Sequence, residues 1–278
     1  MIDLYNQVCE LCSELTTKRY STSFSMGIRL FDKKFRKPIY NIYGYVRFAD
    51  EIVDTFHDHD KAELLKQFRE DTDKALDGRI SLNPILQSFQ RTVHEYNIER
   101  EHIYAFLDSM EMDLSDYKYD QSLYEKYIYG SAEVVGLMCL KVFCEGDEAL
   151  YKELEPFAKS LGSAFQKINF LRDIKSDFEE RGRVYFPGVR YETFSENCKK
   201  TIEADILMDF EMGLEGIKRL PRGAKLGVYL AYVYYTNLFK KIKNCPAVRV
   251  QEERIRVRNR RKIVLLASST FKHTFNLI

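Results

Sequence analysis

Apolar residues recur at helical intervals along nearly the whole chain. Between residues 38 and 56 they fall at Ile42, Val46, Ala49, Ile52 and Val53, which is the spacing of one face of a helix. The same pattern predicts helices over 3–19, 60–77, 84–96, 99–116, 121–144, 192–219 and 222–244. A further helix begins near residue 147 or 156 and ends at Gly182. These elements predict an all-α fold.

Two segments do not follow this helical pattern. Residues 21–25 form a polar break, and the chain from Val248 onward has no clear assignment. In that tail Arg254, Arg256 and Arg258 alternate with apolar residues before a basic run at 260–262. No Gly/Ser-rich linker or internal repeat divides the chain, so we expect a single domain over 1–278.

The apolar content is high enough for a large core. Of 278 residues 45% are hydrophobic, and the net charge is only +1, which does not favour a nucleic-acid partner. Nineteen Tyr and nineteen Phe occur without any Trp, and they either fill the core or line an apolar cavity. The segment 134–144 is apolar on all sides and is expected to be buried all round.

Cysteine usage and the absence of targeting signals indicate a cytoplasmic chain. Only Cys9 and Cys12 form a C-x-x-C pair, with no second pair to complete a zinc site, and the other four cysteines are expected to be reduced thiols. The N-terminal residues lack the features of a signal peptide, and no apolar run approaches the length of a membrane span. We therefore expect a soluble or peripheral protein.

Three oxygen-bearing side chains share one face of the helix that ends at Gly182. Asn169, Asp173 and Asp177 are spaced i, i+4 and i+8, which stacks them along that face. Such a row suits Mg²⁺, which prefers oxygen ligands. A solvated acidic surface would have the same spacing, so this row alone does not establish a metal site.

A second acidic pair lies in the helix over 38–56. Asp50 and Asp54 are four residues apart, with Arg47 and Tyr43 near the same face. Two such rows facing each other across a bundle would hold several Mg²⁺ ions, with Mn²⁺ as a possible substitute. Metal ions held in this way bind a diphosphate and stabilise it as a leaving group. The resulting carbocation needs apolar and aromatic walls that exclude water.

These residues resemble the motifs of squalene and phytoene synthases. The segment from Tyr43 to Asp54 is similar to the first aspartate-rich motif of that family, and the segment from Asn169 to Pro187 is similar to the second. Residues 20–25, 110–114 and 127–138 resemble the early and central blocks. The order and distances also agree over residues 19–187, and the match is looser beyond Pro187. Glu51 stands where many members carry Asp, which leaves its own metal role open.

The resemblance implies an isoprenoid synthase helical bundle around a central apolar cavity. It also implies that two allylic diphosphates are joined head to head through a cyclopropylcarbinyl diphosphate. Metal ligands would be Asp50, Asp54, Asn169, Asp173 and Asp177. Diphosphate would be bound by Arg47, Arg172 and Arg183, with hydrogen bonds from Ser21, Ser23, Tyr43, Gln166 and Tyr185. Tyr129 would lie near the reacting centre, and the tunnel would be lined by Phe24, Val135, Gly136, Leu161 and Phe165. Tyr235 and Arg254 are candidates for late site residues, although an exposed surface role suits Arg254 equally well.

Within the family, a bacterial phytoene synthase acting on two geranylgeranyl diphosphates fits best, with no NADPH expected. Ile28 is a candidate floor of the tunnel, and its medium size favours the longer substrate. Alternatives are a dehydrosqualene, squalene or presqualene (hydroxysqualene) synthase that uses two farnesyl diphosphates, and a non-catalytic relative that acts as an assembly factor.

The Arg-rich tail is either a solvated surface or a contact with anionic lipid at the inner face of the membrane. The oligomeric state stays open.

Overall fold

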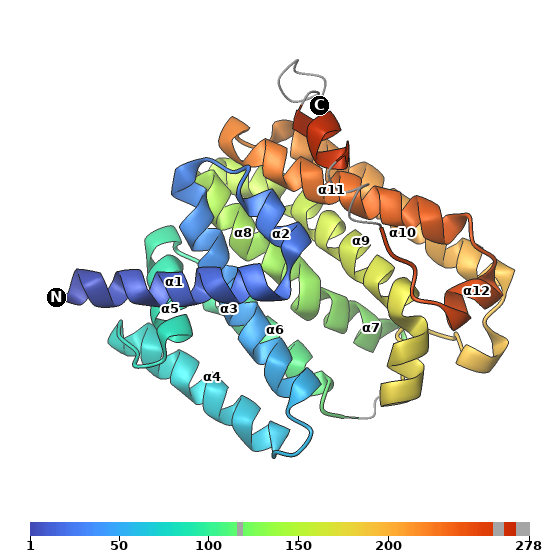
Figure 1. Ribbon diagram of the computed structural model, residues 1–278, viewed down its shortest axis with the longest axis horizontal. Coiled ribbons are helices and arrows are strands. Elements are labelled where there is room, and N and C mark those ends of the chain that lie inside the picture. Colours follow the sequence, from blue (N-terminus) through green and yellow to red (C-terminus); the bar gives the residue numbers. More distant parts are fainter. Residues whose placement is uncertain (116–118, 258–263, 271–278) are drawn as a thin grey trace.

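The computed structural model describes residues 1–115, 119–257 and 264–270, except the side chains at 180 and 181, and this part is helical without any strand. Figure 1 shows the helices packed around a long central helix, with the N-terminal helix lying across one face. The predicted all-α fold is therefore confirmed.

The N-terminal half forms six helices. These are α1 (Ile2–Tyr20), α2 (Thr22–Ile28), α3 (Lys33–Thr55), α4 (Lys61–Gly78), α5 (Pro84–Tyr96) and α6 (Arg100–Met112). The polar break expected at 21–25 is instead the start of α2, because the Ser21 hydroxyl accepts a hydrogen bond from the Phe24 amide at 3.1 Å and caps the new helix. Helix α3 begins five residues before Pro38.

The apolar middle of the chain is helical but not uniform. It consists of α7 (Gln121–Ile128), the π-helical segment η1 (Tyr129–Glu133) and α8 (Val134–Cys144), where the sequence predicts one regular helix. Gly130 permits close packing here, since a Cβ at this position would lie 2.3 Å from the Ala105 carbonyl oxygen of α6. Contrary to the expectation above, the run Gln121–Cys144 is long and apolar enough to cross a membrane, but 61% of its most apolar window is buried in this fold. It is accordingly a core helix of the bundle.

Helix α9 (Glu148–Arg181) is the central element of the bundle. Its start is fixed by Asp147, whose side chain accepts a hydrogen bond from the Leu150 amide at 3.0 Å, so Pro156 lies inside the helix. It ends at Gly182, whose φ of 65° is the left-handed conformation that glycine adopts readily. It packs against α8 and α10, which gives the candidate metal row of Asn169, Asp173 and Asp177 a rigid support.

The C-terminal part contains η2 (Tyr191–Thr193), α10 (Glu196–Arg219), α11 (Arg222–Lys243) and α12 (Ala247–Glu252). The helix predicted over 192–219 starts later because Ser195 caps α10 through the Cys198 amide at 3.3 Å. Residues 264–270 are again helical. The basic residues Arg258, Arg260, Arg261 and Lys262 of the tail lie outside the described residues.

Aromatic side chains supply much of the packing, as their abundance suggests. Tyr45 stacks on Phe89 with ring centroids 3.8 Å apart, and Phe170 stacks on Tyr185 at 4.1 Å. In α8 eight of eleven residues are buried, so the expectation for 134–144 holds except for Val135, Gly136 and Cys139, which are partly exposed on one face. All six cysteines are free thiols.

Candidate active site

An apolar cavity of about 480 Å³ lies among α2, α3, α8, α9 and α11. Most of the residues predicted to line a tunnel or bind substrate do line this cavity. They are Ser21, Ser23, Phe24, Ile28, Tyr43, Val135, Gly136, Leu161, Phe165, Gln166, Asn169, Arg172 and Tyr235. The volume falls in the range of small-molecule sites, and apolar walls of this kind bind hydrocarbon chains.

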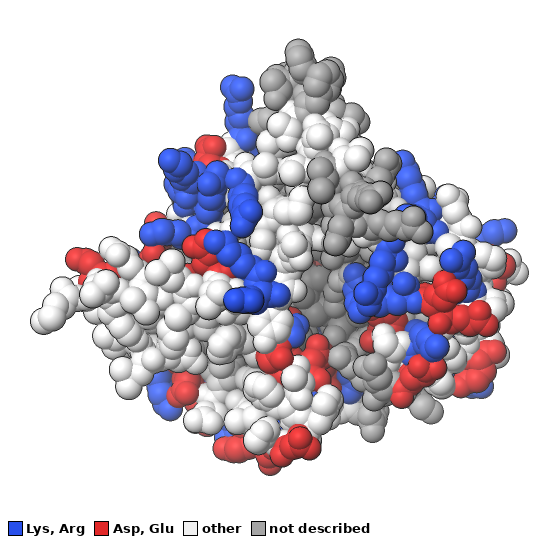
Figure 2. Space-filling model, viewed as in Figure 1, with Lys and Arg blue, Asp and Glu red and all other residues white. Residues whose placement is uncertain are grey.

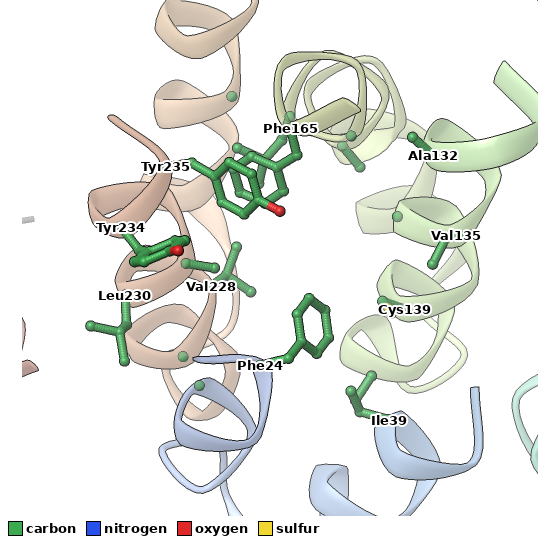
Figure 3. A pocket seen from close by; sticks show the side chains of 18 of the residues that line it. Phe24, Ile39, Ala132, Val135, Cys139, Phe165, Val228, Leu230, Tyr234 and Tyr235 are labelled. Carbon is green, nitrogen blue, oxygen red and sulfur yellow. The ribbon is translucent and has the colours of Figure 1, made fainter. Parts of the chain in front are cut away.

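Aromatic rings from four helices face one another across this space. The Phe24 and Tyr43 centroids lie 5.1 Å apart, and the Phe165 ring stacks on Tyr235 at 4.1 Å with an angle of 17° between planes. Figure 3 shows Phe24 pointing into the cavity, with Val135 on the opposite wall and the Phe165–Tyr235 pair above it. The negative faces of such rings stabilise a nearby cation, and the walls exclude water.

One end of the cavity is polar. The Tyr235 hydroxyl and the Asn169 side-chain oxygen lie 3.4 Å apart, and the Gln166 amide donates to the Ser131 hydroxyl at 3.2 Å. A second, more polar cavity of about 440 Å³ adjoins this end. Its lining shares Ser21, Ser23, Arg172 and Tyr234 with the first cavity and adds Tyr20, Thr22 and residues 254–257. An apolar space thus adjoins a polar space whose lining includes guanidinium groups, which bind phosphate oxygens well.

The acidic row on α9 continues from this polar end. Asp173 is one helical turn beyond Asn169, and its carboxylate accepts from Arg172 Nε at 2.9 Å and from Arg254 Nε at 2.7 Å. Arg254, which the sequence left undecided, is therefore at the site although its side chain is 50% exposed. The protein satisfies the Asp173 carboxylate with two guanidinium groups, and binding of a metal ion would release them.

The acidic pair on α3 begins two turns beyond Tyr43. The Asp50 side chain is 33% exposed, and the burial of the rest raises its pKa to about 7 with help from the charges of Asp54 and Asp113, while Arg47 lowers it. Arg47 pairs with Glu51 and lies 4.4 Å from the centroid of the Tyr20 ring. A carboxyl group crowded by like charges is a suitable position for a cation.

Arg183 and Tyr185 lie in a buried hydrogen-bond network and do not line either cavity. Arg183 donates to the Asp113 carboxylate at 3.0 Å and to the Asp113 and Ser115 carbonyl oxygens at 2.9 Å. The Tyr127 hydroxyl donates to the same carboxylate at 2.7 Å, and the Tyr185 hydroxyl lies 3.3 Å from it. Burial and then the Asp113 charge raise the pKa of Tyr127, so it stays protonated and donates. This network ties the segment after α9 to the end of α6.

Tyr129, the predicted residue near the reacting centre, lies at the start of η1 and does not line the cavity. Lys159 Nζ lies 5.8 Å from the centroid of its ring. Sequence reasoning assigned no role to Asp113, although it stands beside Glu111 in the block Met110–Leu114 that resembles the family. It also assigned no role to Tyr20, which opens the block 20–25 that resembles the family.

In the described part of the chain, no three His, Cys, Asp or Glu side chains come close enough to hold a metal ion by themselves. The two acidic rows therefore do not form a complete metal site from protein ligands alone. Mg²⁺ in proteins is commonly bound by one or two carboxylates together with substrate phosphates. The donor set and the crowded Asp50 carboxyl fit such shared coordination. Figure 2 shows a hollow in this face of the molecule, with Asp and Glu side chains along its lower rim and Lys and Arg on both sides.

Comparison with known proteins gives one consistent result. The profile of the squalene/phytoene synthase family matches residues 17–261. A 4,4'-diapophytoene synthase from Staphylococcus haemolyticus is 28% identical over 201 residues, which are 69% of this chain and 67% of the relative. A 15-cis-phytoene synthase from Pantoea ananas is 30% identical over 179 residues, which are 60% of this chain and 56% of that relative.

Solved structures agree on the fold. A dehydrosqualene synthase crystallised with a ligand superposes with a TM-score of 0.79 at 20% identity, over 95% of this chain and 96% of that chain. A squalene synthase from Alicyclobacillus acidocaldarius gives a TM-score of 0.75 at 20% identity, over 87% of this chain and 95% of that chain. The helical arrangement is therefore the one expected from the motifs. Because the family profile covers most of the sequence, the chain belongs to the squalene/phytoene synthase family.

Proposed function

We propose that this protein is a phytoene synthase. It would join two geranylgeranyl diphosphates head to head, through the cyclopropylcarbinyl (prephytoene) diphosphate, to give phytoene, the precursor of carotenoids, without a reductant. The observation that carries this proposal is that an apolar cavity shares Ser21, Ser23, Arg172 and Tyr234 with an adjoining polar cavity, whose Arg254 pairs with Asp173 of the acidic row on α9. In this arrangement a prenyl chain would lie in an apolar environment and its diphosphate in a polar one, which suits each of them.

At the polar end the chain offers hydrogen-bond donors and cations for a diphosphate. Ser21, Ser23 and Arg172 line both cavities, and Arg254 lies beside them. Arg172 and Arg254 now pair with Asp173, so a diphosphate would replace the carboxylate as their partner. Mg²⁺ held by Asp50, Asp54, Asn169, Asp173 and Asp177 would neutralise the charge that develops on the leaving diphosphate. Arg47 and Tyr43 are placed to assist from α3.

The remaining proposed site residues are supports around this end. The hydrogen bonds of Arg183 and Tyr185 to Asp113 favour a role in holding Asp113 next to Asp50. The negative charge of Asp113 contributes to the raised pKa of Asp50. Tyr129 would act from η1, and a π-helical segment is often found at functional sites. The cavity walls, with Phe24, Phe165 and Tyr235, would exclude water while the allylic cation exists.

A second candidate is a dehydrosqualene or presqualene diphosphate synthase that uses two farnesyl diphosphates. It is favoured by the relative from Staphylococcus haemolyticus, whose name refers to 4,4'-diapophytoene and whose alignment covers the larger share of this chain.

The size of residue 28 favours the first candidate instead. Ile28 is buried at 1% exposure and lines the apolar part of the cavity. A phenylalanine there would shorten the space for the chain, so the smaller isoleucine supports the longer substrate.

The test is a competition between substrates. Purified protein is incubated with equal amounts of geranylgeranyl and farnesyl diphosphate plus Mg²⁺, with and without NADPH, and the products are identified by mass. We expect phytoene as the main product, unchanged by NADPH. A preference for the fifteen-carbon substrate would reject the phytoene assignment in favour of the second candidate.

We also propose a cytoplasmic protein that contacts the inner face of the membrane peripherally.

A further inference from the structure

The N-terminal helix α1 carries its large apolar side chains on the outside. Cys9, Ser13 and Thr17 form its buried face. On the outer face Leu4, Val8, Leu11 and Leu15 are between 48% and 67% exposed. A surface helix of a globular protein normally has the opposite arrangement, with the apolar stripe toward the core. The inverted pattern indicates that something other than this chain covers the outer face.

Tight packing explains why α1 cannot turn its leucines inward. A Cβ at Gly44 of α3 would lie 2.9 Å from the Ser13 hydroxyl, so the two helices approach closely. The Ser13 hydroxyl is also 2.7 Å from the Ser88 hydroxyl of α5. A leucine does not fit at such a contact, so the small polar residues fix the rotation of α1 and leave its stripe exposed.

The loop between α4 and α5 adds two apolar side chains next to this stripe. Ile80 is 55% exposed and Leu82 is 95% exposed. The loop is held beside the start of α1 because the Tyr5 hydroxyl donates to the Ser81 carbonyl oxygen. We call Leu4, Val8, Leu11, Leu15, Ile80 and Leu82 together the α1 patch. Its members come from two elements, which makes it a surface and not a single row.

The stripe of α1 runs toward the mouth of the cavity. Helix α1 ends at Tyr20, which lines the polar cavity, and its C-cap Ser21 lines both cavities. Lys18, which pairs with Glu14 one turn earlier, and Arg19 occupy the last turn between the stripe and this mouth. The surface over α1 is largely uncharged in Figure 2, and Lys and Arg side chains lie between it and the hollow. Apolar and basic surface are therefore combined on the face where the site opens.

We propose that the α1 patch docks on a lipid bilayer with anionic headgroups, so that the cavity mouth lies near the membrane. Apolar side chains would enter the boundary between headgroups and acyl chains, and Lys18 and Arg19 would contact the headgroups. The benefit for delivering an apolar hydrocarbon rests on the proposed function. The docking itself rests only on the patch.

A second copy of the chain fits this surface less well. The stripe has the 4-3-4 spacing of a coiled-coil seam, but the next position of the repeat is Lys18. A helix pair would place that charge in the seam. At a bilayer surface the long lysine side chain reaches the headgroups without burying its charge. The lysine therefore favours lipid over self-association.

The test is sedimentation with vesicles, without substrate or metal, so its outcome is independent of the catalytic proposal. The full chain is mixed with vesicles of phosphatidylcholine, with or without phosphatidylglycerol, at low and high salt. The variant is Leu4→Ser/Leu11→Ser, and Leu82→Ser is a second variant at a position too exposed to affect folding. The control is Leu207→Ser/Met208→Ser, which removes exposed apolar side chains from α10, a helix that packs on α9 and α11.

We expect wild type and control to bind the anionic vesicles, more weakly as salt rises, and the Leu4/Leu11 variant to bind about tenfold or more weakly. Circular dichroism and the melting temperature verify folding. The proposal is overturned if wild type does not sediment with vesicles, or if the variant binds as well as wild type. It is also overturned if the wild-type protein does not bind vesicles but forms a dimer that the Leu4→Ser/Leu11→Ser substitutions dissociate, because the patch would then bind a second copy of the chain.

Discussion

Replacing Asp113 by Asn tests whether the network around Arg183 is a structural support. Asp113 and Arg183 are both 7% exposed at the side chain, and the exchange keeps the shape of the residue while removing its charge. Arg183 is then left as a buried cation without its carboxylate partner. Breaking such a pair from one side costs about 3–5 kcal/mol. Two backbone carbonyl oxygens still accept from Arg183, so we take the lower end, about 3 kcal/mol.

This cost converts to a measurable shift in thermal unfolding. A chain of this length unfolds with an entropy of about 0.6 kcal/mol per kelvin near its melting temperature, so Asp113→Asn should lower that temperature by about 5 °C. The matched control is Glu111→Gln, because Glu111 is 71% exposed and lies 3.7 Å from Arg69. The loss of such a surface pair costs below about 1 kcal/mol. The control should therefore melt within about 2 °C of wild type.

A double-mutant cycle separates the ion pair from other effects of the substitution. Asp113→Asn combined with Arg183→Gln should cost clearly less than the sum of the two single variants, because the second exchange removes the unpaired charge. Calorimetry or circular dichroism melting supplies all four values. Equal melting temperatures for Asp113→Asn and wild type, or strict additivity in the cycle, would refute the buried-pair reasoning.

Two further predictions concern the cavity and its acidic rim. Folded Asp50 has a pKa near 7, above that of an unfolded aspartate, so the folded state holds an extra proton between about pH 4 and 7. The metal-free protein should therefore lose stability as pH rises from about 4 to 7, and Asp50→Asn should melt above wild type at pH 8 but near it at about pH 4. A melting difference that does not change with pH would contradict this. Ile28→Phe should raise the share of products made from the fifteen-carbon substrate in the competition assay, because Ile28 lines the cavity and a larger side chain there would shorten the space for the prenyl chain. An unchanged product ratio would show that residue 28 does not limit chain length.

The helices and the acidic rows could be predicted from the sequence because both depend on local spacing. The apolar period of α3 and the i, i+4 position of Asp50 and Asp54 are properties of one helix. Many residues predicted from the motif blocks, such as Phe24 and Gln166, line the cavity, and so does Tyr235 from the looser match beyond Pro187. Helix starts were less certain where a single capping side chain such as Ser21 or Ser195 decides them.

Contacts between distant segments could not be predicted in this way. The pairing of Arg183 with Asp113 joins residues 70 positions apart, and no spacing rule connects them. The same holds for Arg254 and Asp173, which are 81 positions apart. Whether the two acidic rows approach each other also depends on tertiary packing, which no spacing within one helix can predict.

The most direct measurement is the binding of a non-ionisable substrate analogue, geranylgeranyl thiodiphosphate, by titration calorimetry with Mg²⁺ and with EDTA. If the acidic rows and the diphosphate share the metal ions, Mg²⁺ alone should bind weakly and the analogue should bind strongly only when Mg²⁺ is present. Asp50→Ala and Asp173→Ala should lose that strong binding, and with it product formation, while their helical spectra stay unchanged. Equal affinity with Mg²⁺ and with EDTA, or full affinity and turnover in both variants, would contradict the metal-diphosphate site.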